Sequence, residues 1–111
     1  MDLVVNYREV IKQIIDEYSR YIPSHGQIEA EKIIDTERDH YEVMHVGWDG
    51  PRRQHGTVLH IDIKNDKIWV QYDGTSRPVV EELLAKGISK ESIVLGFCPR
   101  EERQYTGFAL E

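Results

Sequence analysis

Two aspartates and a lysine in the middle of the chain have side chains that can hold a divalent cation. Asp49 and Asp62 supply carboxylates, and Lys64 follows the second carboxylate by two residues. On adjacent strands, such a set could bind a metal ion and activate water, as in a metal-dependent nuclease. These residues also have ordinary structural roles, because an aspartate before a Gly-Pro pair suits a turn and the other two can form weak cross-strand pairs. Metal-dependent cleavage is therefore an alternative and not the leading interpretation.

The histidines raise the further possibility of a metal site. His60 and Asp62 lie two residues apart, so on a strand their side chains would point the same way and could ligate one ion. The remaining histidines lack the short repeated spacing of a zinc motif: His25, His40, His45 and His55. No second cysteine accompanies Cys98, so we expect neither a bound metal nor another cofactor.

Motifs of the common enzyme classes are missing from the sequence. It contains no Ser-His-Asp or Cys-His arrangement, no glycine-rich phosphate loop and no dinucleotide fingerprint. We therefore expect a protein that binds or regulates something and is not an enzyme.

The charge of the chain limits its partners. Twenty acidic and fourteen basic residues leave a formal net charge of -6, the wrong sign for a surface that binds phosphate backbones. The basic residues are also scattered, with only Arg52-Arg53 and the Arg100/Arg103 pair adjacent or nearly so. A basic partner protein suits this chain better than DNA, and a direct DNA-binding accessory protein is a second alternative.

Length and hydropathy favour one domain over residues 1–111, in the cytoplasm. The 111 residues, 40% of them hydrophobic, suffice for a single core. No apolar run approaches the ~18 residues of a membrane span, and charged residues interrupt the N-terminal segment where a signal peptide would be apolar. The single cysteine fits a reducing compartment.

The N-terminal segment predicts an amphipathic helix of about five turns. Asp2 is a suitable N-cap and Pro23 ends the helix. Apolar residues recur at steps of three and four and form one stripe: Val4, Tyr7, Ile11, Ile14, Ile15, Tyr18 and Ile22.

Residues 27–72 predict a four-stranded antiparallel meander, because β-branched and aromatic runs alternate with turn residues. One face of the sheet is expected to be buried: Thr57, Leu59, Ile61, Ile63, Ile68, Val70 and Tyr72. The other face carries Val58, His60, Asp62, Lys64, Trp69 and Gln71. Trp69 is therefore expected to be an aromatic residue of the outer face.

A second, short helix follows Ser76-Arg77-Pro78 and ends before Gly87. Residues 93–97 form a buried extended or turn segment, Ile-Val-Leu-Gly-Phe. The two helices can cover the apolar face of the sheet, so the expected fold class is α+β, with a four-stranded antiparallel meander packed on one face by a long N-terminal helix and a short second helix.

Four sequence blocks resemble the XisI family over nearly the whole chain. They are Asp35-Thr36-Glu37-Arg38-Asp39-His40-Tyr41, Val46-Gly47-Trp48-Asp49-Gly50, His60-Ile61-Asp62-Ile63-Lys64 with Lys67-Ile68-Trp69-Val70-Gln71, and Ile93-Val94-Leu95-Gly96-Phe97. The resemblance implies a cyanobacterial accessory factor, named for control of the excision of a DNA element during heterocyst differentiation. It also implies a companion called XisH and a separate site-specific recombinase as partners.

An acidic chain without a nucleophile is a poor recombinase and a reasonable regulatory partner for a protein that handles DNA. The expected partner-binding surface comprises Arg38, Asp39, His40, Trp48, Asp49, Arg52, Arg53, His60, Asp62 and Trp69. Buried pairing of Arg38 or Arg53 with Asp49 or Asp62 is the structural alternative. Open strand edges and an aromatic outer face also favour a homodimer.

Overall fold

The computed structural model describes residues 3–111, and the expected N-cap, Asp2, lies outside them. The helices are α1 (Leu3–Tyr18), α2 (Val79–Ala85) and two short 3-10 helices, η1 (Lys90–Ser92) and η2 (Arg100–Tyr105). The strands are β1 (Gln27–Asp35), β2 (His40–Asp49), β3 (Arg52–Lys64), β4 (Lys67–Asp73) and β5 (Ile93–Leu95). Within the part of the chain that the structure describes, no helix is long and apolar enough to cross a membrane.

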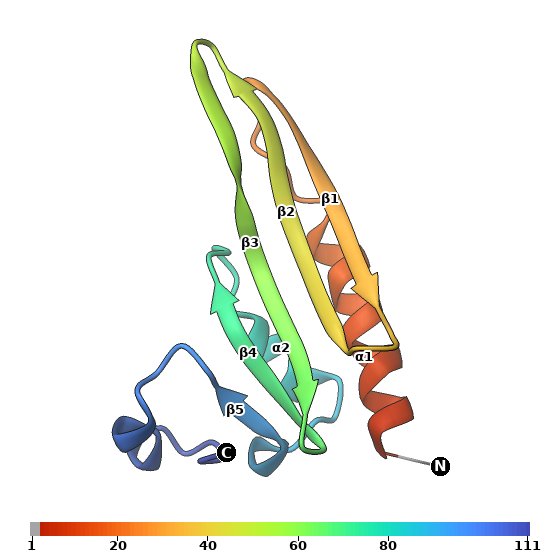
Figure 1. The fold of residues 1–111 in the computed structure, drawn as a ribbon, viewed down its shortest axis with the longest axis vertical. Helices are drawn as coiled ribbons and strands as arrows, with labels where there is room; N and C mark the ends of the chain where they lie inside the picture. Colours follow the sequence, from red (N-terminus) through yellow and green to blue (C-terminus); the bar gives the residue numbers. More distant parts are fainter. Residues whose placement is uncertain (1–2) are drawn as a thin grey trace.

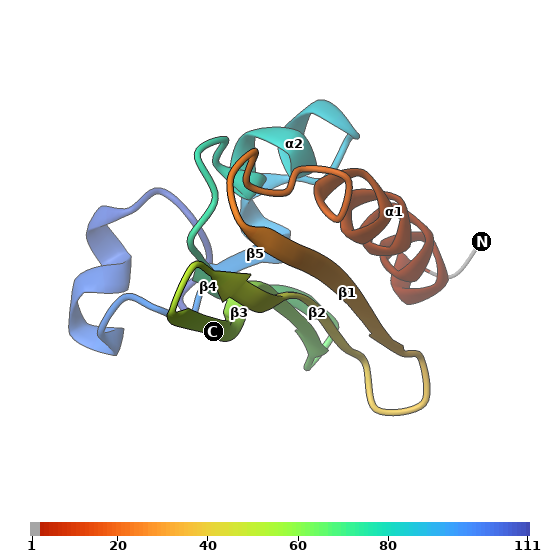
Figure 2. The ribbon, with the colours of Figure 1, turned by 90° about the horizontal axis from the view of Figure 1, so that it is seen from above.

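The strands form one sheet in the order β1-β2-β3-β4-β5, and the first four pair antiparallel with their sequence neighbours (Figure 1). Helices α1 and α2 lie together on one face of this sheet (Figure 2). We call this the inner face and the opposite one the outer face. The α+β class, the antiparallel meander and the two covering helices are confirmed.

The core lies between α1 and the inner face because each contributes one apolar surface. Ile11, Ile14 and Ile15 of α1 are fully buried. They belong to one hydrophobic cluster with Leu59 and Ile61 of β3. Burial of each such side chain contributes about 1.5–3 kcal/mol, so this interface fixes the position of α1 on the sheet.

Helix α1 is shorter than predicted. It ends at Tyr18, and Ile22, which was expected to complete the apolar stripe, is 51% exposed. Pro23 disfavours helical geometry at Ile22, but the chain leaves the α-helix before that point. The Arg20 and Tyr21 amides donate at 3.2 Å to the carbonyls three residues back, Glu17 and Tyr18, so a tighter turn follows Tyr18. The segment from residue 19 to residue 26 instead leads the chain across to β1.

A bulge in β3 places Thr57 on the opposite face of the sheet from the one predicted. Val43 pairs with Leu59 whereas Met44 pairs with Thr57, so Val58 is an extra residue in β3. One extra residue reverses the alternation of side chains. Thr57, predicted on the buried face, therefore lies on the outer face with Met44.

A second bulge, in β4, moves Tyr72. Ile61 pairs with Val70 and His60 pairs with Tyr72, so Gln71 is the extra residue. Tyr72, predicted to be buried with Val70, therefore shares the outer face with His60 and is 50% exposed.

The fifth strand was not predicted. Residues 93–97 were expected to be a buried extended or turn segment, and Ile93 and Val94 are indeed fully buried. Ile93–Leu95 also pairs parallel with β4, from Ile68 to Val70. Parallel neighbouring strands are joined by long crossover connections, so no short turn motif in the sequence indicates that they pair.

Candidate functional site

The predicted partner-binding residues fall into two groups at opposite ends of β2. His40 pairs with Asp62 at one end, and Asp49 pairs with Arg52 at the other. Nine residue steps along a strand correspond to about 30 Å. Asp49 therefore cannot share a cation with Asp62 and Lys64, and the nuclease centre proposed from these three residues is wrong.

The charged residues of the turn between β1 and β2 pair with other residues of the fold. The Asp39 carboxylate accepts hydrogen bonds from Arg8 Nε at 2.8 Å, Arg8 Nη2 at 3.1 Å and the Tyr41 hydroxyl at 2.8 Å. The Arg8 hydrogen bonds hold the pKa of Asp39 below its usual range. Arg38 binds Asp35 at 3.1 Å. Arg38 thus pairs with neither Asp49 nor Asp62, and Asp39 is bound to Arg8 of α1.

Beside this turn, three side chains on the outer face converge on one carboxylate. His40 Nδ1 lies 2.8 Å and His60 Nε2 lies 2.9 Å from the same Asp62 Oδ1. Gln71 Nε2 donates to Asp62 Oδ2 at 3.1 Å. The hydrogen bond to Asp62 raises the pKa of His40. We call His40, His60 and Asp62 the histidine–aspartate cluster, whose donor atoms could hold a cation.

Sequence spacing identified only two of the three residues of this cluster. His60 and Asp62 share a strand face as predicted, whereas His40 was set aside because it lacks the short repeated spacing of a zinc motif. His40 lies 22 residues from Asp62. The β2–β3 pairing places His40 directly opposite Asp62. Pairing the two predicted strands in register would have revealed this contact, but the bulge at Val58 shifts a register counted from the turn.

Trp69 is not the exposed anchor that the sequence predicted. It lies on the outer face opposite Asp62 but is only 7% exposed. The Arg103 guanidinium lies 5.1 Å and Lys64 Nζ lies 4.5 Å from its ring, and its Nε1 donates to the Lys64 carbonyl at 3.2 Å. The C-terminal segment therefore covers Trp69, which is unavailable to a partner.

The other predicted group lies at the tip of an arm, residues 44–57 of β2, β3 and their turn. The arm extends beyond the end of β4 (Figure 1). Trp48 is 51% exposed, and the Arg53 guanidinium lies 5.4 Å from its ring centre. Trp48, Asp49, Arg52 and Arg53 thus lie together, as expected, and remain accessible.

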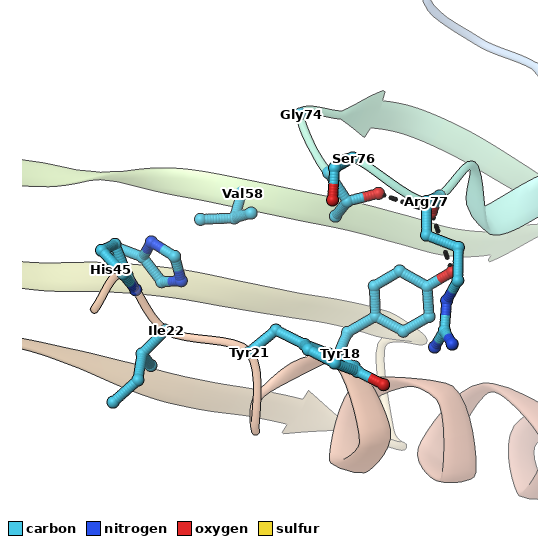
Figure 3. A pocket seen from close by; sticks show the side chains of 10 residues that line it. Tyr18, Tyr21, Ile22, His45, Val58, Gly74, Ser76 and Arg77 are labelled. Carbon is cyan, nitrogen blue, oxygen red and sulfur yellow. Dashed lines mark hydrogen bonds between the residues drawn. The ribbon is translucent and has the colours of Figure 1, made fainter.

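A pocket of about 380 Å³ lies on the inner face, between the end of α1, the base of the arm and the segment after β4 (Figure 3). Its lining is mostly aromatic and aliphatic: Tyr18, Tyr21, Ile22, Pro23, His45, Val58, Gly74, Thr75, Ser76 and Arg77. The Tyr18 hydroxyl donates to the Arg77 carbonyl at 2.9 Å, and the Arg77 guanidinium lies 5.0 and 5.2 Å from the Tyr18 and Tyr21 rings. These contacts hold the segment after β4 against the end of α1.

His45 contributes a buried polar atom to the lining of this pocket. Its Nε2 is buried and has no hydrogen-bond partner among residues 3–111. A buried polar atom without a partner is costly, so a group that hydrogen-bonds to His45 would be favoured there. The sequence did not predict this pocket, because Tyr18 and Ile22 were assigned to the apolar stripe of the first helix and the early end of α1 was not foreseen.

Comparisons with known proteins agree with this architecture. The family model described as XisI protein matches residues 1–110. A crystal structure of a XisI-like protein from Anabaena variabilis is 41% identical, with a TM-score of 0.91, and the match covers 99% of this chain and 100% of that one.

A second similar structure is described as the fdxN element excision controlling factor XisI from Anabaena variabilis. It is 35% identical, with a TM-score of 0.85, and the match again covers 99% of this chain and 100% of that one. No curated protein matches the chain significantly. On the family match and these two full-length structural similarities, the chain belongs to the XisI family.

Proposed function

We propose that this chain is a non-catalytic, cytoplasmic accessory factor that controls excision of a DNA element by binding a partner protein. Membership of the XisI family and similarity to a fdxN element excision controlling factor support the excision-control role. The inner-face pocket supports the binding role, because it combines an apolar lining with exposed rim residues.

The pocket has the physical character of a protein-docking site. Energetically dominant interface residues are mostly large side chains that fill preformed pockets. Tyr21 and Ile22 are more than half exposed at the rim, so a partner would bury apolar surface that water now covers. A hydrogen bond between the partner and His45 Nε2 would also satisfy the buried ring nitrogen.

The XisH-like companion is the first partner to test, and a site-specific recombinase is the second. The net charge of -6 favours a partner with a basic surface and disfavours direct DNA binding by this chain. In this role, the chain would govern assembly of a DNA-handling protein without performing chemistry itself.

Co-purification with the genomically neighbouring XisH-like protein tests the proposal, with light scattering on each protein and on the mixture. We expect a stable mixed complex, weakened at least tenfold by Ile22→Glu, which places a charge at the pocket rim. Leu110→Glu is the matched control, because Leu110 is 53% exposed, against 51% for Ile22, and lies outside the pocket. Separate elution of the two wild-type proteins, or equal weakening by both variants, would contradict this model.

A homodimer is a second candidate assembly, favoured by the open edge of β3. Residues 52–57 pair with β2 on one side, whereas β4 first pairs with β3 at Leu59. Among the described residues, this part of β3 therefore has no strand on its other side, and an exposed edge can pair with a second copy.

In an antiparallel dimer centred on this edge, Gln54→Lys would bring two positive charges close to the two-fold axis. We expect the mass measured by light scattering to be that of a dimer and to fall toward the monomer in this variant. Gln104→Lys, in η2, is the control with the same change of charge. A monomeric wild-type chain would exclude the dimer.

A further inference from the structure

We propose that the histidine–aspartate cluster is a binding site for a divalent transition metal of the zinc type. The donor atoms of His40, His60 and Asp62 all lie within 4.8 Å of one another. Ligand bonds of about 2.0–2.2 Å allow atoms at such separations to surround one ion. This inference goes beyond partner binding and reverses the expectation, drawn from spacing alone, that no metal is bound.

The donor set selects the class of metal. Imidazole nitrogen suits zinc, copper, nickel and iron, whereas magnesium and calcium prefer sites made of oxygen ligands. Two imidazoles and one carboxylate are a common protein contribution to zinc sites and leave at least one coordination position open. A water molecule or a group from a partner could fill that position.

The backbone holds these ligands in place before a metal arrives. His40 lies opposite Asp62 across β2 and β3, and His60 lies two residues before Asp62 on the same strand. Gln71 of β4 binds the second Asp62 oxygen at 3.1 Å and orients the carboxylate. Ligands on paired strands with such outer support form a preorganised site.

The site is also accessible to ions. The His40 side chain is 52% exposed and that of His60 is 32% exposed, whereas that of Asp62 is only 13% exposed. An ion can therefore approach from the His40 side, with the less exposed Asp62 carboxylate beneath it. In the competing interpretation, hydrogen bonds alone hold these three side chains together. The test must therefore distinguish hydrogen bonding from metal coordination.

Zinc titration of the full chain by calorimetry at neutral pH is the direct test. We expect one equivalent of zinc to bind, and His60→Ala or Asp62→Asn to weaken the affinity about tenfold or more. His55→Ala is the matched control, because His55 lies on the same strand, is exposed and is outside the cluster. It should leave the affinity unchanged.

Cobalt(II) provides a second readout, because its visible absorption reports coordination directly. The visible absorption of bound cobalt should appear in the wild-type chain and in His55→Ala, and should be lost in His40→Ala. His40 is the most exposed ligand, so this variant should keep the fold and the unfolding transition of the wild type. Absence of zinc binding by the wild-type chain, or unchanged affinity in both His60→Ala and Asp62→Asn, would overturn the site.

Discussion

The Arg8 guanidinium of α1 binds both carboxylate oxygens of Asp39, at 2.8 and 3.1 Å, and so ties the first helix to the turn between β1 and β2. Asp39 has a φ of 58°, a left-handed conformation that few residues other than glycine, asparagine and aspartate adopt readily. The fully buried Tyr41 donates its hydroxyl to the same carboxylate. One residue therefore sets the turn, satisfies a buried hydroxyl and positions a helix.

Replacing Asp39 should destabilise the fold. Asp39→Ala leaves the buried Tyr41 hydroxyl without its acceptor, and we expect a loss of about 1–3 kcal/mol in the free energy of unfolding by urea. Asp39→Asn should lose less, because asparagine tolerates a positive φ and its amide oxygen can accept from Tyr41. Equal stability of Asp39→Ala and the wild type would refute this role.

The same carboxylate predicts a pH dependence. The pKa of Asp39 is lowered in the folded state, chiefly by the Arg8 hydrogen bonds, so its ionised form is favoured by folding. The resulting stability should be fully present above the unfolded value of about 3.9 and be lost as the pH falls through the folded pKa. The stability difference between the wild type and Asp39→Asn should therefore be constant near neutral pH and shrink below about pH 4. Urea unfolding of both proteins over that range measures it, and a constant difference down to the lowest pH would argue against it.

Gly47 is needed where β1 approaches β2 closely. A Cβ atom at Gly47 would lie only 2.0 Å from the Gln27 carbonyl oxygen, whereas one at Gly56 would meet nothing within 4 Å. We expect Gly47→Ala to destabilise the chain by about 1–3 kcal/mol, as overpacking does. Gly56→Ala is the matched control and should be near neutral in the same thermal or urea unfolding measurement. Similar losses in the two variants would show that the close approach is not the cause.

Arg103 should control the exposure of Trp69. Besides lying over the indole ring, Arg103 donates to the carbonyls of Cys98 and Leu110 and so fixes the C-terminal segment. In a Trp48→Phe background, which leaves one tryptophan, Arg103→Ala should shift the emission to longer wavelength and increase quenching by acrylamide.

Arg100 offers the comparison for that experiment. Its side chain is 71% exposed and pairs with Glu111. Arg100→Ala should therefore leave Trp69 emission unchanged. If Arg103→Ala behaves in the same way, the cover over Trp69 does not depend on the Arg103 contacts.

The sequence by itself determined the parts of this protein that depend on local patterns. The three- and four-residue spacing of Tyr7, Ile11 and Ile15 predicted the buried face of α1, and all three are buried. Alternation along β3 likewise identified Leu59 and Ile61 as inner-face residues. Helical and strand periods are properties of neighbouring residues, so they can be read without knowing what the element packs against.

Only the tertiary structure decided which distant residues meet. Bulges at Val58 and Gln71 reversed predicted faces, because an extra residue is accommodated through pairing with another strand. Strand pairing brought His40 to Asp62 and kept Asp49 about 30 Å away along β2. Trp69 lies on the face that its alternation predicts, yet it is buried because Arg103, far along the chain, returns over it. Periodicity specifies which face a side chain occupies, whereas long-range pairing and packing decide what covers that face and which groups form a site.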